Sequence, residues 1–270
     1  MADHSRHPPH EGTRLPHVGT YRRVLPVSIE RLYENAIDWA HLPHLHAGSF
    51  AAIRCIASGP WGFRAAVETP SGAASVIELS LDRRLRRWIT RTLEGRNAGA
   101  EIWTHAFAVE PRRTDIVVDF FVPGVEAAAR ARVGAAFADL YSRLYDEDVA
   151  MMVERQRQLD RRIDSADAPR EVVVGRIDAL DFPRVEAYRG HDFWIVREGD
   201  ALRAYAAQCP HMLGPLPDTP APDGTVTCPW HGYRFDVATG ACLSDAPCRL
   251  PPAPDVGVGP DGMVTLAPPR

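Results

Sequence analysis

The sequence predicts an α+β chain of two domains, and three observations support this. Up to residue 161, a strand-like segment and a helix precede six further strand-like segments and one long helix. From residue 171 onward, short strand-like segments alternate with turns. Between them, residues 162–170 are polar, contain Pro169 and lack periodicity, as is typical of a linker. Residues 1–20 are polar and rich in His and Pro, so we expect them to be disordered.

The first domain, residues 21–161, is expected to start with a strand at 21–27 and a helix at 28–40, for which Ser28 is a suitable N-cap. Strands separated by turn residues follow at 50–56, 63–67, 75–81, 84–93, 100–109 and 115–121. A helix at about 126–159 ends the domain. This order fits a curved antiparallel sheet around the last helix, with a cavity between them. A plain α+β domain without a cavity would have the same order.

The second domain, residues 171–270, is expected to be small and all-β. Its candidate strands lie at 171–177, 193–197, 202–207, 225–228 and 264–266. Proline is dense from Pro210 onward, so the loops are long relative to the strands. Most of the residues with recognisable chemistry lie in these loops.

The composition narrows the class of protein. With 270 residues, of which 45% are hydrophobic, the chain can bury a core in each domain. The net charge of −4 argues against a nucleic-acid-binding protein. Neither a membrane span nor a standard secretory signal is recognisable, so we expect a cytoplasmic location. Five cysteines, an odd number, are more typical of metal ligands than of disulfides in such a chain.

The strongest motif consists of two Cys/His pairs in the second domain. Cys209 and His211 are separated by one residue, and Cys228 and His231 by two, with residues 212–227 between the pairs. Two thiolates and two imidazoles can hold one tetrahedral zinc ion. They can also hold a [2Fe–2S] cluster in which cysteines ligate one iron and histidines the other.

The residues around these pairs favour the cluster. The segments CPHMLGPL from Cys209 and CPWHGYRFD from Cys228 resemble the Rieske iron–sulfur domain. Met212 and Leu213 stand where that family usually has Arg-Gly. The resemblance implies a [2Fe–2S] cluster held by Cys209, His211, Cys228 and His231. We expect the remaining nearby cysteines, Cys242 and Cys248, to be small buried residues.

A second candidate metal site lies around the first helix. His41 and His46, with His44 as a further candidate, lie near its end, and two imidazoles plus a carboxylate form the facial triad that binds non-haem Fe(II). On the long helix, Asp148 shares a face with apolar residues, whereas the same helical count turns Asp146 and Glu147 elsewhere. A buried carboxylate needs a cation beside it. A partly solvated Asp148 remains an alternative.

The pattern Asn35-x-x-Asp38-x-x-His41-x4-His46, followed by Glu-Asp on a terminal helix, resembles the catalytic domain of Rieske non-haem iron oxygenases. The likeness is to the ring-hydroxylating alpha subunits, with the domain order reversed. It implies a helix-grip (START/SRPBCC-like) first domain with mononuclear Fe(II). It also implies iron ligands His41, His46 and Asp148, a catalytic bridging carboxylate at Asp38, and Asn35 close to the iron.

The resemblance therefore implies an oxygenase that uses cluster electrons and O₂ at Fe(II) to hydroxylate, dihydroxylate or demethylate an apolar or aromatic small molecule. We expect a cavity lined by residues such as Phe107, Phe121, Phe137 and Met151. A separate NAD(P)H-dependent reductase, with or without a ferredoxin, would supply electrons, because no nucleotide-binding fingerprint is present. We further expect a homo-oligomer, a trimer, in which Asp38 meets His231 of a neighbouring subunit.

Two other classes of function remain open on the sequence alone. In one class, the first domain binds a hydrophobic ligand without catalysis, and the Rieske domain acts as an electron carrier or sensor. Alternatively, the chain would be a zinc-stabilised binding module without redox chemistry. Colour separates the zinc protein from the others, and the iron content separates an oxygenase from a carrier.

Overall fold

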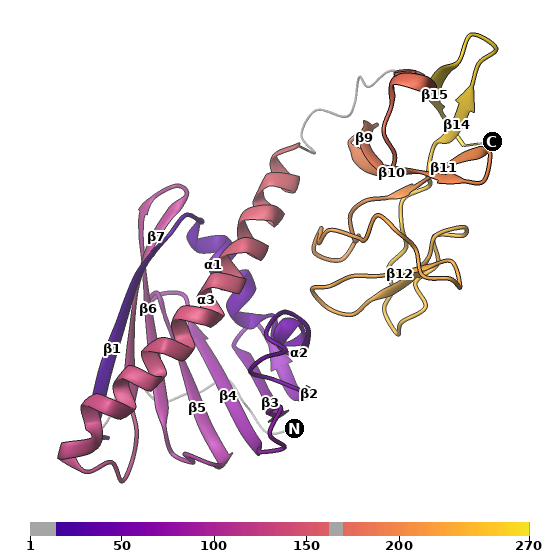
Figure 1. Cartoon of the computed structure of the whole chain (residues 1–270). Helices are drawn as coiled ribbons and strands as arrows, with labels where there is room; N and C mark the ends of the chain where they lie inside the picture. Colours follow the sequence, from indigo (N-terminus) through magenta and orange to yellow (C-terminus); the bar gives the residue numbers. More distant parts are fainter. Residues whose placement is uncertain (1–14, 162–169, 270) are drawn as a thin grey trace. The chain divides into compact units, whose positions relative to one another are not determined.

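The computed structural model describes residues 15–161 and 170–269. It divides the chain into two compact units, one ending at Val149 and the other beginning at Ala150. The division therefore falls inside the long helix α3 (Arg130–Arg161), whereas the sequence analysis expected the boundary in a linker at residues 162–170. Figure 1 shows α3 as one continuous helix. Most of the predicted linker, 162–169, lies outside the described residues.

The first unit is built on one antiparallel sheet of seven strands in the order β1-β7-β6-β5-β4-β3-β2. All neighbours pair antiparallel, as short hairpin connections require. The strands are β1 (His17–Leu25), β2 (Ala52–Gly59), β3 (Gly62–Glu68), β4 (Ala74–Asp82), β5 (Arg87–Gly95), β6 (Glu101–Glu110) and β7 (Arg113–Phe121). Because β1 begins at His17, the prediction of disorder through residue 20 was too long.

The sheet curves around α3 (Arg130–Arg161), which is preceded by a 3₁₀ turn at Ala127–Ala129 (Figure 1). Aromatic rings join helix and sheet: Phe137 stacks on Phe120 with ring centroids 5.3 Å apart. Three residues earlier on α3, a Cβ atom on Gly134 would lie 2.1 Å from the carbonyl oxygen of Val18, so only glycine permits this close approach of α3 to β1. This is the helix-grip (START-like) arrangement that the sequence predicted.

The segment after β1 contains a break that matters for the site. Helix α1 (Ile29–Ile37) starts at Ser28, whose hydroxyl accepts a hydrogen bond from the backbone N–H of Arg31. The single helix predicted to residue 40 instead ends at Ile37. Asp38 leaves the helical conformation and is followed by a 3₁₀ turn (Trp39–His41) and the short helix α2 (Leu42–Leu45). The chain thus changes direction between Asp38 and His46.

The second unit holds three small antiparallel sheets, with orders β11-β10-β9, β12-β13 and β14-β15-β8. The strands are β8 (Val172–Arg176), β9 (Arg184–Tyr188), β10 (His191–Glu198), β11 (Ala201–Ala206), β12 (Thr225–Thr227), β13 (Arg234–Asp236), β14 (Asp255–Val258) and β15 (Met263–Ala267). Strands β9, β13 and β14 were not predicted from the sequence. Within the described residues, no helix combines the length and apolar character needed to cross a membrane.

Candidate metal centres

Three buried side chains of the first unit converge as the sequence predicted. The potential ligand atoms of His41, His46 and Asp148 all lie within 4.8 Å of one another. His41 ends the 3₁₀ turn, His46 follows α2, and Asp148 lies on α3. His44 is exposed on α2 and does not join them. The two imidazoles lie close together, with ring centroids 5.1 Å apart.

The three groups meet at a single carboxylate oxygen. Oδ1 of Asp148 lies 3.1 Å from Nε2 of His46 and 3.5 Å from Nε2 of His41. The same oxygen accepts a hydrogen bond of 2.9 Å from the side-chain amide of Asn35, which is buried as well. Both imidazoles therefore present Nε2 toward Asp148, and Asn35 holds the carboxylate in place.

A second carboxylate lies behind each imidazole. Oδ2 of Asp38 is 3.4 Å from Nδ1 of His41, and Oε2 of Glu147 is 2.5 Å from Nδ1 of His46. A carboxylate at Nδ1 fixes the tautomer that leaves Nε2 free to bind a metal, and it raises the basicity of that nitrogen. The expectation that Glu147 points elsewhere was therefore wrong. Its long side chain reaches around α3 from a half-exposed position.

Burial and the nearby carboxylates determine the charge of this cluster. Burial opposes a positive charge on His41, but its hydrogen bonds with Asp148 and Asp38 raise its pKa to about 9. Burial would likewise raise the pKa of Asp148, but hydrogen bonds from His41 and His46 hold it well below its usual value. Both shifts favour an ionised carboxylate beside a protonated imidazole.

The donor set fits a mononuclear Fe(II) ion. Two imidazole nitrogens and one carboxylate oxygen are the ligands of the non-haem iron facial triad, which leaves coordination positions open. The two further carboxylates behind His41 and His46 are the outer partners that metal-bound histidines require. A divalent cation would also replace the proton that now balances Asp148, so metal and proton compete for this site.

A cavity of about 140 Å³ opens directly onto these residues. Its walls come from the helices and from the concave face of the sheet. They comprise Asn35, Ala36, Asp38, His41, Leu42, His46, Phe50, Phe63, Ile77, Leu79, Trp88, Thr90, Tyr141, Leu144, Tyr145 and Asp148. Burial, with the charge of Asp148, raises the pKa of Tyr141 above its usual value, so this phenol stays neutral in the wall.

The lining predicted from the sequence was wrong. Phe107 is half-exposed near the end of β6, and Phe137 packs against Phe120 in the core. Phe121 contacts His17 and Trp103 instead of the cavity. Met151 is buried but does not line the cavity either. Periodicity identified apolar positions, but it could not tell which of them face the open space.

The two Cys/His motifs of the second unit form matching loops. The backbone N–H of Cys209 donates to the carbonyl of Gly214 at 2.8 Å, and that of Leu213 donates back to the carbonyl of Cys209 at 2.9 Å. In the second loop, Cys228 donates to Tyr233 at 2.8 Å and the N–H of Gly232 returns to Cys228 at 2.9 Å.

The fourth residue after each cysteine has a left-handed backbone, with φ of 65° at Leu213 and 68° at Gly232. This conformation suits glycine and strains leucine. The first loop therefore has a strained leucine at the position where the second loop has glycine.

The side chains of these loops separate into a cysteine pair and a histidine pair. Cys209 and Cys228 are fully buried, and the hydrogen bond between them lowers the pKa of Cys228 to about 5, against the opposing effect of burial. The rings of His211 and His231 lie 4.5 Å apart and nearly perpendicular. His211 is exposed, whereas His231 is buried.

This geometry fits a [2Fe–2S] cluster better than one zinc ion. A tetrahedral zinc ion needs all four ligands around one point. Among the described residues, only His41, His46 and Asp148 form a convergent set of this kind. A cluster instead takes two cysteines on one iron and two histidines on the other. At Gly214, a Cβ atom would lie 2.7 Å from the ring of Trp230 and 3.1 Å from Sγ of Cys228, so glycine keeps this side of the thiolates open.

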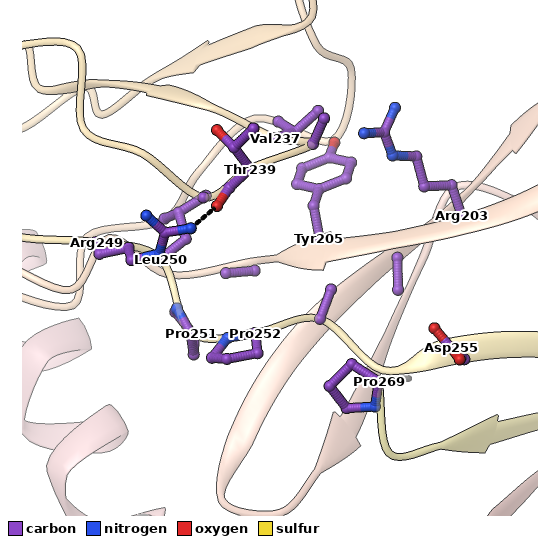
Figure 2. A pocket seen from close by; sticks show the side chains of 15 residues that line it. Arg203, Tyr205, Val237, Thr239, Arg249, Leu250, Pro251, Pro252, Asp255 and Pro269 are labelled. Atoms are coloured by element: carbon purple, nitrogen blue, oxygen red, sulfur yellow. Dashed lines mark hydrogen bonds between the residues drawn. The ribbon is translucent and has the colours of Figure 1, made fainter.

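A further cavity of about 330 Å³ lies elsewhere in the second unit (Figure 2). It is lined by residues from β11 and from two segments around residues 237–240 and 249–253. None of the proposed metal ligands of the two centres contributes to its walls, and neither do Asp38 and Asn35. Cys242 and Cys248, predicted to be buried, are only half-buried.

Comparison with known proteins supports the second centre. Residues 171–254 match the family model of the Rieske [2Fe–2S] domain. The ferredoxin of carbazole 1,9a-dioxygenase from Nocardioides aromaticivorans IC177 is 33% identical over 37% of this chain and 100% of its own, with a TM-score of 0.31. No curated protein matches the chain.

Other similar solved structures share less sequence identity with this chain. A protein from Thermus thermophilus is 17% identical, covers 51% of this chain and 97% of its own, and has a TM-score of 0.43. The Zhui aromatase/cyclase from Streptomyces sp. R1128 is 14% identical over 53% of this chain and 96% of its own, with a TM-score of 0.41.

Proposed function

Because residues 171–254 form a Rieske [2Fe–2S] domain, we propose that the chain is the terminal component of a Rieske-type non-haem iron oxygenase. It would hydroxylate, dihydroxylate or demethylate a small apolar or aromatic compound. The observation that carries the proposal is the set His41, His46 and Asp148, which faces a cavity in a chain that also has a one-electron carrier. Neither a carrier nor a simple ligand-binding domain needs such a set.

Fe(II) at this site would supply O₂ binding and activation, and the cluster would supply electrons one at a time. The chain's own residues prepare the site. Asp38 lies beside Nδ1 of His41, and Glu147 hydrogen-bonds Nδ1 of His46, so each Nε2 would be available to the metal. Asn35 donates to Asp148 and keeps its carboxylate oriented. Aromatic rings form part of the wall beside the reacting groups and limit their contact with bulk water.

The cavity indicates the size and chemistry of the substrate. A space of about 150 Å³ accommodates one benzene ring, so a volume of about 140 Å³ suits a compound with a single ring. The rings of Phe50, Phe63 and Trp88 provide flat apolar contacts. Thr90 and the neutral phenol of Tyr141 can hydrogen-bond a hydroxyl or ether oxygen.

Electrons would reach the iron between subunits of a homo-oligomer, a trimer, after delivery by a separate NAD(P)H-dependent reductase. Asp38 already contacts the imidazole of His41 and is suited to bridge it to a cluster histidine. We propose that this histidine is His231 of a neighbouring subunit, the second histidine of the cluster motif.

Iron counting tests the proposal on protein purified without oxygen. An oxygenase of this type should contain about three iron atoms per chain, whereas an electron carrier with a ligand-binding domain should contain about two. Asp148→Ala should lose about one iron and retain the Rieske spectrum. Asp146→Ala, at an exposed position two residues earlier on α3, is the matched control and should lose none.

Turnover provides the second part of the test. Reduced protein should consume O₂ and form an oxygenated product from single-ring probes such as toluene or anisole, and Asp148→Ala should not. An iron content of about two in the wild type, with no O₂ consumption, would instead support the electron carrier.

A further inference from the structure

Two cysteines outside both metal centres face each other across a pair of extended segments. Ala241 and Arg249 form an antiparallel bridge. In antiparallel pairing the residue numbers of opposite partners have a constant sum, so Cys242 is opposite Cys248. Opposite residues have Cα atoms about 4.5–5.5 Å apart. Disulfides span Cα separations of about 4.4–6.8 Å, so this pair can be bridged without moving the backbone.

The neighbouring contacts hold the same register. The backbone N–H of Leu250 donates to the carbonyl of Gly240 at 2.9 Å, one step further along the pair. The guanidinium of Arg249 donates to the carbonyl of Thr239, as the dashed line in Figure 2 marks. These two segments form part of the wall of the cavity in Figure 2. The alignment of the cysteines is therefore set by several contacts.

The two thiols also touch each other and lie close to the cluster loop. Burial raises the pKa of Cys248 to about 11, and so does its hydrogen bond with Cys242. Cys248 further interacts electrostatically with the cluster ligand Cys228. Cys242 pairs with Phe235 in β13, the strand that follows the second ligand loop. Both cysteines are half-buried, so a small reagent can reach them.

We propose that Cys242 and Cys248 form a reversible disulfide that clamps the segment behind the second cluster loop. The oxidant is a small disulfide of the oxidised glutathione class. One thiolate attacks it and releases one reduced thiol, and the other protein thiolate then attacks the mixed disulfide and releases the second. The new S–S bond leaves the protein pair oxidised by two electrons, and the small disulfide becomes two thiols.

The test uses the holoprotein in buffers of reduced and oxidised glutathione, followed by alkylation and tryptic digestion. Both cysteines fall in the tryptic peptide 235–249, which has no internal cleavage site. In the oxidised buffer this peptide should escape alkylation and be lighter by two hydrogen atoms. Reduction should restore two alkylation sites, and the Rieske spectrum should persist throughout.

Serine variants provide the controls. Cys248→Ser should abolish the internal disulfide, and Cys55→Ser, on β2 of the other unit, should leave it unchanged. The oxidised wild type should also lose its cluster to a chelator several-fold more slowly than the reduced form, and this difference should vanish in Cys248→Ser. Full alkylation of peptide 235–249 in the oxidised buffer would refute the pair, and equal rates of cluster loss would refute the clamp.

Discussion

Replacing Glu147 tests whether the carboxylate behind His46 tunes the metal site. Its Oε2 lies 2.5 Å from Nδ1 of His46, and Asp148 lies beyond the opposite nitrogen. Glu147→Gln retains an acceptor oxygen but loses the charge, whereas Glu147→Ala loses both. Removing an outer partner of a metal-bound histidine costs about 10- to 100-fold in metal affinity.

The loss of Fe(II) affinity should depend on how exposed the Glu147 side chain is to solvent. The side chain of Glu147 is 45% exposed, so water partly screens its charge. We therefore expect Glu147→Gln to weaken Fe(II) binding about tenfold, equivalent to about 1.4 kcal/mol. Glu147→Ala should weaken binding more, toward 100-fold, because the imidazole then also loses its orientation.

The assay is anaerobic equilibrium dialysis of Fe(II) against protein that contains its cluster, with unfolding temperature as a check on folding. Asp146→Asn is the matched control. It removes a carboxylate one position earlier on α3, where Asp146 forms an exposed ion pair with Arg23 at 2.7 Å. Its Fe(II) affinity should match the wild type. If Glu147→Ala bound Fe(II) as tightly as Asp146→Asn, the carboxylate would have no role in the metal site.

Three further predictions concern stability and the cluster loop. The pKa of His41 is raised to about 9 from 6.5, so below pH 6.5 the metal-free protein should be about 3 kcal/mol more stable than His41→Gln. This difference in the free energy of unfolding, measured with urea, should disappear as the pH rises through 9. Leu213→Gly relieves about 1–2 kcal/mol of backbone strain but removes a buried side chain worth about 2–5 kcal/mol, so thermal unfolding should show a net loss of stability. Gly214→Ala places a methyl group against Trp230 and Cys228, and it should sharply reduce iron and sulfide per chain.

Much of the first site could be predicted because helical periodicity and short sequence spacing determine where its residues lie. Asp148 lies on the apolar face of a regular helix, and the spacing of the histidines is compact. Glu147 was missed because a helical count assigns a direction to the Cα–Cβ bond, whereas a glutamate is long enough to reach a neighbouring face. The cavity walls depend on which side of each strand faces the concave surface, and alternation alone does not provide this.

The second unit was predicted less completely, because its structure depends on contacts between loops. Strands β9, β13 and β14 have only three to five residues each, too few for alternation to emerge among prolines and turns. The left-handed backbone at Leu213 has no signal in the sequence, since leucine rarely adopts it. The loop closure from Cys209 and the buried side chain together hold it there.

The break at Asp38 sets where the two histidines of the first metal site lie. In a regular helix, His46 would come five positions after His41, which amounts to a rise of about 7.5 Å and a rotation of about 140°. Here helix α1 ends at Ile37, His41 ends a 3₁₀ turn, and His46 leaves the helical conformation after α2. In this arrangement Oδ1 of Asp148 lies 3.5 Å from Nε2 of His41 and 3.1 Å from Nε2 of His46. Since Asp38 is also the carboxylate behind His41, the residue at the break both redirects the chain and orients a ligand.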